Sequence, residues 1–245
     1  MKNAVKTACR SLLKVAARLG SPFDRAYLAD DVPESQVQKR WEDYVSKVNK
    51  GEGLRILEIG SREVTGPSTA RERFSNGKYV GFDYYPGRNV DVVGDVHRLS
   101  SYFTAGQKFD IIYTIASFEH FAMPWIVAEE ISKMLAVNGM LFVTTHFSFK
   151  AHERPWNFFQ FSDMGLRVLF SSLLGFECIE AGMSNPLVGR FSALADKPLR
   201  YVPVRGLYCS SSYLGKKVRD VPSFDWHQAP IDEIVVGTTY PKPKH

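Results

Sequence analysis

Cysteine is scarce in this 245-residue sequence, because the three residues Cys9, Cys178 and Cys209 lie far apart and form no CxxC pair. An odd number of separated cysteines argues against a disulfide framework and against a zinc site built from thiolates. No HxxxH or HExxH spacing indicates a metal either. No apolar stretch approaches the ~18–20 residues that cross a bilayer. The sequence therefore predicts a protein of a reducing compartment, with no metal and no membrane-spanning helix.

Acidic residues are absent from residues 1–20, which contain five basic ones: Lys2, Lys6, Arg10, Lys14 and Arg18. These five account for the whole net charge of +5, so the remaining chain is neutral. Duplex nucleic acid requires a broad basic surface on its partner. We therefore expect no nucleic-acid partner.

The basic residues of 1–20 recur every four positions, which places them on one stripe of a helix, with the apolar residues largely opposite. Three interpretations stay open: a helix at an anionic membrane surface, a transit peptide, or a surface helix packed on the domain. Gly20-Ser21-Pro22 ends this helix. A second helix is expected at 33–49, so residues 1–50 form an N-terminal helical extension.

Short apolar runs alternate with helical patterns in residues 51–245, where we expect a single α/β domain. Such alternation builds a mostly parallel sheet with helices on both faces. A last strand, at 231–240, is expected at an antiparallel edge, and 185–230 lacks a clear period and is expected to be an insertion. The other predicted strands are 54–59, 78–83, 90–93, 109–115, 139–146 and 175–181, and the predicted helices are 67–74, 98–104, 124–137 and 162–174.

The loop after the first predicted strand is part of LRILEIGSREVTGPS and has only two glycines, Gly60 and Gly66. A dinucleotide pyrophosphate needs close backbone approach, which is why GxGxxG is typical of its binding loop. Glu58 precedes Gly60 by two residues, and its charge has the wrong sign for a phosphate. A nucleoside that carries an amino acid suits this loop better than NAD. A nicotinamide oxidoreductase stays a rival, and the missing GxGxxG argues against it.

Residues 53–184 resemble the class I S-adenosylmethionine-dependent methyltransferases. Four further motifs follow the acid and glycine of the first loop in the expected order: YVGFDYYPG, GDVHRLS, FDIIYTIASFEHFAMPW and VNGMLFVTTH. The resemblance implies a Rossmann-like, seven-stranded, mostly parallel sheet and S-adenosylmethionine as the cofactor. It implies that Asp83 accepts hydrogen bonds from the ribose hydroxyls and that Asp95 contacts the adenine. The implied cofactor-binding residues are Glu58, Gly60, Ser61, Asp83, Tyr84, Asp95, Val96 and Ser117.

Structural roles for three of these residues remain alternatives. Asp83 is also a typical turn residue, and Asp95 equally suits the N-cap of the short helix that follows it. Glu58 is alternatively a buried acid that shapes the loop through hydrogen bonds.

Within the superfamily the chain is most similar to a bacterial, type 11-like group that is linked to glycan or secondary-metabolite assembly. The similarity lies in HERPWNFFQFS at 152–162. The group more often has Asp at the position of Asn157 and Arg at that of Gln160. This exchange argues against a carboxylate base here and leaves a structural hydrogen bond open.

Three histidines are candidate catalytic bases, because a group with a pKa near 7 suits the deprotonation of a hydroxyl. His120 follows the fourth strand, His146 ends the fifth, and His152 lies in the loop beyond. The carboxyl ends of these strands are where an acceptor would meet the methyl group. The alternative for each is an ordinary packed or solvated histidine.

These observations predict methyl transfer to a small-molecule acceptor, at a hydroxyl of a sugar, glycan intermediate or secondary metabolite. A non-catalytic member that binds only a cofactor or a partner is a second rival. The expected location is the cytoplasm. Contact of residues 1–20 with the inner membrane surface and formation of a homo-oligomer stay open.

Overall fold

The computed structural model describes residues 11–12, 14–27, 35–48 and 53–234 of the chain. It divides into two compact units, each described by itself below. One comprises residues 34–184 and 210–245, and the other comprises residues 1–33 and 185–209. The expected helix at 1–10 lies outside the described residues.

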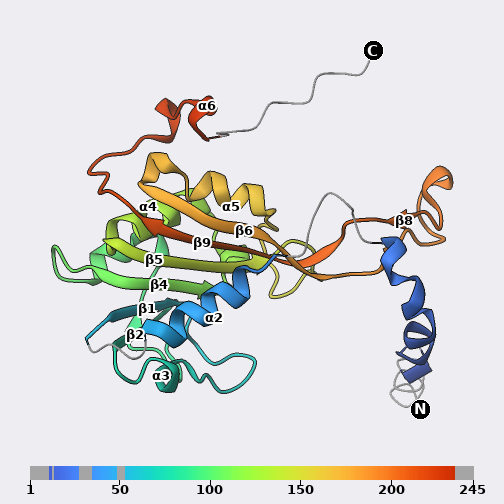
Figure 1. The fold of residues 1–245 in the computed structure, drawn as a ribbon, viewed down its shortest axis with the longest axis horizontal. Coiled ribbons are helices and arrows are strands. Elements are labelled where there is room, and N and C mark those ends of the chain that lie inside the picture. The colour runs from blue at the N-terminus through green and yellow to red at the C-terminus, as the bar shows by residue number, and fades with distance from the viewer. Residues whose placement is uncertain (1–10, 13, 28–34, 49–52, 235–245) are drawn as a thin grey trace. The chain divides into compact units, whose positions relative to one another are not determined.

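Seven strands of the described residues form one sheet in the order β3-β2-β1-β4-β5-β9-β6 (Figure 1). The pairs β1–β2, β2–β3, β1–β4 and β4–β5 are parallel, whereas β5–β9 is antiparallel. The strand order reverses between β1 and β4, and ligands of such sheets bind beyond the carboxyl ends of the strands at that point. The predicted Rossmann-like, mostly parallel sheet is confirmed. The strands are β1 (Arg55–Ile59), β2 (Lys78–Asp83), β3 (Val92–Val93), β4 (Phe109–Ile115), β5 (Leu135–His146), β6 (Phe176–Pro186) and β9 (Tyr208–Lys217).

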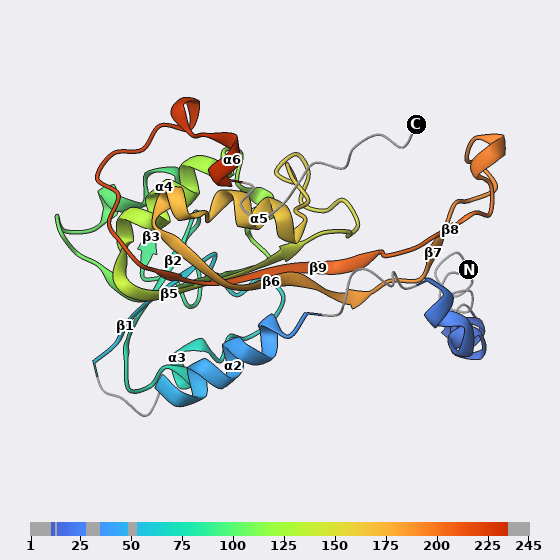
Figure 2. The ribbon, with the colours of Figure 1, turned by 45° about the horizontal axis from the view of Figure 1, so that its top comes forward.

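Helices cover both faces of the sheet. In Figure 2, α2 and α3 lie on one face, and α4 and α5 on the other. The four helices are α2 (Val37–Val48), α3 (Ala70–Arg73), α4 (Pro124–Met134) and α5 (Asp163–Leu169). Two short 3-10 helices, η2 (Val96–Tyr102) and η3 (Phe118–His120), follow β3 and β4, and two more, η4 (Ser172–Leu174) and η6 (Trp226–Gln228), lie later in the chain.

The α2 helix belongs to the sheet domain through its apolar face. Val37, Trp41 and Val45 of this helix are buried. The Trp41 ring stacks on Phe142 of β5, with ring centroids 4.7 Å apart and an angle of 3° between the rings. A buried aromatic pair of this kind contributes by its area and by its ring geometry. The predicted helix at 33–49 is therefore part of the core.

The last strand differs from the prediction. Residues 231–234 form a helical turn, α6 (Ile231–Ile234), and the rest of the predicted strand lies outside the described residues. The antiparallel strand is β9, inside the segment that was expected to be an insertion. It is not an edge strand, because it lies between β5 and β6.

The second unit contains a small two-stranded antiparallel sheet of β7 (Gly189–Arg190) and β8 (Pro203–Val204). The 3-10 helix η5 (Lys197–Leu199) lies between them in the chain. Residues 14–20 are helical and continue into the 3-10 helix η1 (Ser21–Tyr27). The backbone amide of Gly206 donates to the carbonyl of Tyr27 at 2.9 Å. Among the described residues, no helix is long and apolar enough to span a bilayer.

Candidate active site

The loop after β1 makes a sharp turn at Gly60. This residue has φ +80°, and its amide donates to the carbonyl of Phe82 at 2.8 Å. A Cβ atom at Gly60 would lie 2.0 Å from Oγ of Ser117. Glycine is therefore required for both its backbone angle and its close contact. The turn brings together three predicted cofactor residues, Gly60, Ser61 and Ser117, at the carboxyl ends of β1 and β4.

Asp83 ends β2 and faces the same loop. Its Oδ2 accepts the amide of Arg62 at 3.1 Å, and its Oδ1 accepts the amide of Tyr85 at the same distance. The guanidinium of Arg62 is 3.4 Å from Oδ1. The neighbouring ring of Tyr84 is exposed and lies 6.0 Å from that of Trp156. Asp83 and the exposed ring of Tyr84 thus lie after β2, next to the loop of Gly60, and ribose binding by Asp83 stays a prediction.

Asp95 is the N-cap of η2. Its Oδ1 accepts the backbone amide of His97 at 3.0 Å and lies 2.6 Å from Nδ1 of the same residue. Partial burial raises the pKa of Asp95, but these hydrogen bonds outweigh it and the pKa is lowered. Val96 is buried in the core. The capping alternative for Asp95 is present in the structure, and its contact with adenine stays a prediction.

Glu58 forms its hydrogen bonds with tyrosines. Its Oε2 accepts the hydroxyl of Tyr113 at 2.8 Å and that of Tyr79. Burial raises the pKa of Glu58, although these donors act in the opposite direction. Asn89 donates to the hydroxyl of Tyr79 at 2.8 Å and to the carbonyl of Ser61 at 3.1 Å. Glu58 thus supports the cofactor loop through a chain of hydrogen bonds, and a direct contact with the cofactor stays a prediction.

The three candidate histidines converge on one carboxylate, that of Glu119 in η3. The distances from its Oε1 to the Nε2 atoms are 3.0 Å for His146, 3.8 Å for His152 and 4.0 Å for His120. Glu119 is fully buried, and its other oxygen accepts the hydroxyl of Thr145 at 2.7 Å. The rings of His120 and His152 have centroids 4.9 Å apart. We call these four residues, Glu119, His120, His146 and His152, the Glu119 cluster.

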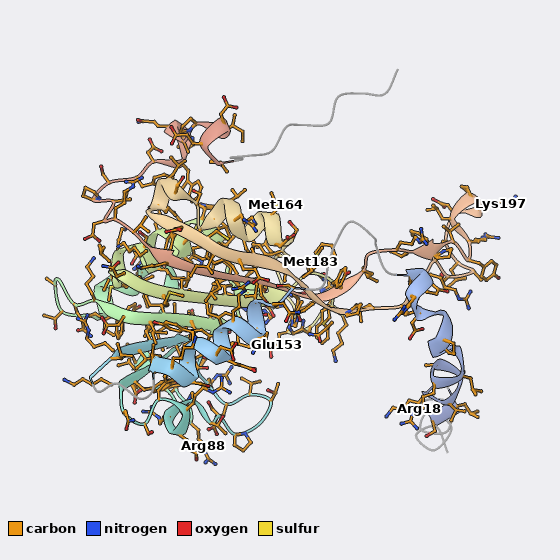
Figure 3. The ribbon with its side chains drawn as sticks, viewed as in Figure 1. Arg18, Arg88, Glu153, Met164, Met183 and Lys197 are labelled. Carbon is orange, nitrogen blue, oxygen red and sulfur yellow. The ribbon has the colours of Figure 1, made fainter. Side chains whose placement is uncertain are left out.

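Backbone hydrogen bonds hold the segment after β5 over this cluster. The carbonyl of Glu119 accepts the amides of Phe158 at 2.9 Å and Phe159 at 3.2 Å. The side-chain amide of Gln160 accepts from the backbone amide of Phe149 at 3.3 Å and donates to its carbonyl at 3.0 Å. Gln160 therefore makes the structural hydrogen bonds that the sequence left open. Figure 3 labels Glu153, the neighbour of His152 in this segment.

Burial shapes the protonation of the cluster. It lowers the pKa of His146 from its ordinary value, even though the charge of Glu119 acts to raise it. The ring of His146 stacks on Phe149, with centroids 4.3 Å apart. Burial therefore favours the uncharged form of His146, although a buried carboxylate lies next to it.

Sequence reasoning missed Glu119 and Thr145 as site residues. Glu119 stands between Phe118 and His120 in the motif after the fourth strand, and Thr145 directly precedes His146. The position of Glu119 directly before a candidate histidine is the one feature of the sequence that indicates a role in the site. Its burial and its distances to the three histidines depend on how the segment after β5 folds back, which no local pattern predicts.

Comparisons with known proteins identify the superfamily. Residues 34–172 match a protein family described as methyltransferase domain. The match spans more than half of the chain. The chain belongs to this family. S-adenosylmethionine is the methyl donor, and the rival nicotinamide oxidoreductase is overturned by the family match. A search of curated proteins found no match.

Several solved structures have a similar fold, and some of them are described as methyltransferases. N-methyltransferase NodS from Bradyrhizobium japonicum, solved with S-adenosyl-L-homocysteine, is 13% identical, with 80% of this chain and 97% of that chain covered and a TM-score of 0.45. Magnesium protoporphyrin IX methyltransferase from Synechocystis, solved with S-adenosylmethionine, is 13% identical, with coverage of 74% and 79% and a TM-score of 0.43. YcgJ from Bacillus subtilis is 14% identical, with coverage of 73% and 99% and a TM-score of 0.47.

Proposed function

We propose that this methyltransferase transfers the methyl group to a hydroxyl oxygen of a small-molecule acceptor. The observation that carries this proposal is the Glu119 cluster at the carboxyl ends of β4 and β5. A neutral amine attacks the methyl group through its lone pair and loses its proton afterwards, whereas a hydroxyl must lose its proton to become a good nucleophile. An imidazole next to a buried carboxylate is suited to accept that proton.

The proposed cofactor site is formed by the loop after β1 and the end of β2. A Cβ at Gly60 would collide with the side chain of Ser117, so only glycine allows this close approach of the loop to the end of β4. Asp83 offers carboxylate oxygens for the ribose hydroxyls, and Tyr84 an exposed ring beside it. Ser61, Asp95 and Val96 are assigned to the same site from the sequence motifs. When bound, S-adenosylmethionine supplies a methyl group on a positively charged sulfur, which requires alignment more than activation.

The residues of the chain then have two tasks at the acceptor. The aromatic segment after β5 is held next to Glu119 by the amides of Phe158 and Phe159, and its proposed task is to cover the bound acceptor. An imidazole of the cluster takes the proton of the acceptor hydroxyl, and the resulting imidazolium is stabilised by the buried charge of Glu119. A sugar, a glycan intermediate or a secondary metabolite carries hydroxyls of the required kind.

Membrane contact is a further part of the proposal. Helical residues Leu12, Val15 and Leu19 have exposed fractions of 69%, 55% and 76%, and Lys14 and Arg18 are exposed on the same helix. Exposed apolar residues next to basic ones are typical of helices at anionic bilayer surfaces. This arrangement favours a cytoplasmic enzyme at the inner membrane surface, acting on an acceptor that is presented there. Association with a second copy of the chain stays a prediction.

The chemistry is tested by supplying the purified chain with methyl-labelled S-adenosylmethionine and matched pairs of acceptors, each pair differing only in a hydroxyl or an amine. We expect label on the oxygen of the hydroxyl compounds, at a rate that Glu119→Gln lowers and that the exposed Asp43→Asn on α2 leaves unchanged. Label on amines alone would contradict O-methylation. Binding of the cofactor with no transfer to either class would favour a non-catalytic role.

A further inference from the structure

Glu119 is a buried anion with an unsatisfied oxygen. Its side chain has no exposed surface, and its Oε1 accepts no hydrogen bond from the described residues. His146 Nε2 is only 3.0 Å away, but it is not directed along a hydrogen bond. An uncompensated carboxylate of this kind is costly, so a cationic partner is expected there.

His120 and His152 each have an unprotonated Nε2 atom near Oε1 of Glu119. Nδ1 of His120 is 2.6 Å from the carbonyl of Trp156, and Nδ1 of His152 is 3.0 Å from the carbonyl of Lys150. A carbonyl only accepts, so both Nδ1 atoms carry the proton and both Nε2 atoms have a free lone pair in the neutral ring. Metal-binding histidines are oriented in the same way, with one ring nitrogen donating to a carbonyl and the other on the ion.

The distances from Glu119 to His120 and His152 are too long for direct hydrogen bonds and are compatible with an ion bound between them. From Oε1 of Glu119, Nε2 lies 3.8 Å away in His152 and 4.0 Å away in His120, beyond the ~2.7–3.2 Å of an N–H···O bond. Two donors bound to one ion at ~2.1 Å each are separated by ~3.0 Å at a right angle and ~3.4 Å at a tetrahedral angle. Donor atoms of Glu119, His120 and His152 all lie within 4.8 Å of one another. The most distant pair would therefore have to approach by up to about 1.4–1.8 Å for the three to close around an ion.

We propose that Glu119, His120 and His152 bind one divalent transition-metal ion of the zinc class. Two imidazoles and a carboxylate suit such ions, whereas Mg²⁺ and Ca²⁺ take oxygen ligands. The sequence predicts no metal, because these ligands come from η3 and from the segment after β5 and follow no contiguous spacing. If the proposed O-methylation holds, the ion would bind the acceptor oxygen and lower its pKa. His146 then remains as the imidazole that takes the proton.

The test uses the full chain, stripped of metal with a chelator and titrated with Zn²⁺ by calorimetry. Metal content after gel filtration gives the stoichiometry. We expect about one Zn²⁺ per chain, and a loss of affinity of at least ~10-fold in His152→Asn and in Glu119→Gln. His227→Asn is the matched control, because His227 is exposed on η6 and lies outside the cluster. Substitution with Co²⁺ adds an absorption spectrum that reports nitrogen ligation.

Several results would overturn the metal site. They are the absence of stoichiometric Zn²⁺, equal Zn²⁺ affinity in the wild type and in His152→Asn, and Mg²⁺ binding as tight as that of Zn²⁺. Thermal unfolding of each variant shows whether it is folded, and His152, which lies in a loop, is the safer position. S-adenosylmethionine affinity, measured on the same samples, separates failure of the metal site from failure of the proposed function. Normal S-adenosylmethionine binding without Zn²⁺ binding would refute the metal site and leave the proposed function standing.

Discussion

His146 Nε2 lies 3.0 Å from Oε1 of Glu119, although His146 ends β5 and Glu119 follows β4. Because β4 and β5 are parallel neighbours, the ends of both strands lie at the same edge of the sheet. The Gly60 turn and Asp83 lie at this edge as well, after β1 and β2. The predicted cofactor residues and the Glu119 cluster therefore lie at the same edge of the sheet, which methyl transfer between two bound molecules requires.

Replacement of Asp83 by Ala is expected to weaken S-adenosylmethionine binding by ~1–3 kcal/mol, because the ribose hydroxyls lose their acceptor. Isothermal titration calorimetry measures this change. The amides of Arg62 and Tyr85 also lose their partner, so thermal unfolding must show that the variant is folded. Unchanged affinity in a folded Asp83→Ala protein, with Asp43→Asn as the control, would remove Asp83 from the site.

His120→Asn and His146→Asn are both expected to lower kcat, and the variant that removes the base is expected to lower it by ~10²–10⁴-fold, the usual range for loss of a general acid or base. Cofactor affinity should stay near the wild-type value, because neither ring contacts the Gly60 turn or Asp83 through a described hydrogen bond. Steady-state kinetics and direct cofactor binding measure the two effects. His227→Asn should resemble the wild type. Normal turnover in both cluster variants would exclude the cluster from catalysis.

Trp41→Ala should destabilise the fold by ~3–5 kcal/mol, because it removes a fully packed ring that stacks on Phe142. Urea unfolding, followed by far-UV circular dichroism, measures the free energy of unfolding. The matched control is Trp125→Ala on α4, whose side chain is 41% exposed. An equal loss in both variants would contradict the placement of α2 in the core.

Glu58 is expected to make the free energy of unfolding depend on pH. Its pKa is raised in the folded protein, so the folded state binds its proton more tightly than the unfolded state does. Its contribution therefore falls as the pH rises from about 4.5, the ordinary value, through the raised pKa. The groups that face it are the hydroxyls of Tyr79 and Tyr113, the amide of Asn89 and the charge of Arg73.

Glu58→Gln tests this dependence, because it removes the ionisation and keeps a polar side chain. We expect the variant to gain stability relative to the wild type as the pH is raised from 4.5 to 7, as measured by urea unfolding at several pH values. A difference in stability that stays constant with pH would show that Glu58 has an unshifted pKa.

Deletion of residues 1–20 should leave the melting temperature of the sheet domain unchanged and reduce binding to anionic vesicles. The physical reason is the loss of five basic residues together with exposed leucines. Co-sedimentation with vesicles that contain phosphatidylglycerol measures the binding, and neutral vesicles are the control. Equal sedimentation of the full chain and the truncated chain would remove the proposed membrane contact.

The sequence predicts the order and type of most elements correctly. Strands such as 54–59 and 109–115 are buried on both faces, and their apolar runs are distinctive. The exceptions are the predicted strand at 231–240, which begins with the helical turn α6, and β9, whose run Cys209-Ser210-Ser211-Ser212 is typical of a loop. Its serines are accommodated inside the sheet, where Ser212 donates to the hydroxyl of Thr144 at 2.8 Å. Pairing across strands is a tertiary effect, so the polarity of this run alone does not predict that it forms a buried strand.

The sequence predicts the individual residues of the candidate site but not how they are arranged. It indicates each of the three histidines separately, from its position relative to a predicted strand. Their convergence depends on Glu119, and on hydrogen bonds such as that between Nδ1 of His120 and the carbonyl of Trp156, 36 residues later in the chain. Such contacts between distant residues set distances and tautomers, and neither can be obtained from residue spacing.

The most direct test is a crystal structure of the chain with S-adenosylhomocysteine and Zn²⁺. We expect the adenosine against the Gly60 turn, its ribose hydroxyls on Asp83, and its sulfur facing the Glu119 cluster. An adenosine bound elsewhere, or a sulfur directed away from Glu119, would contradict the account.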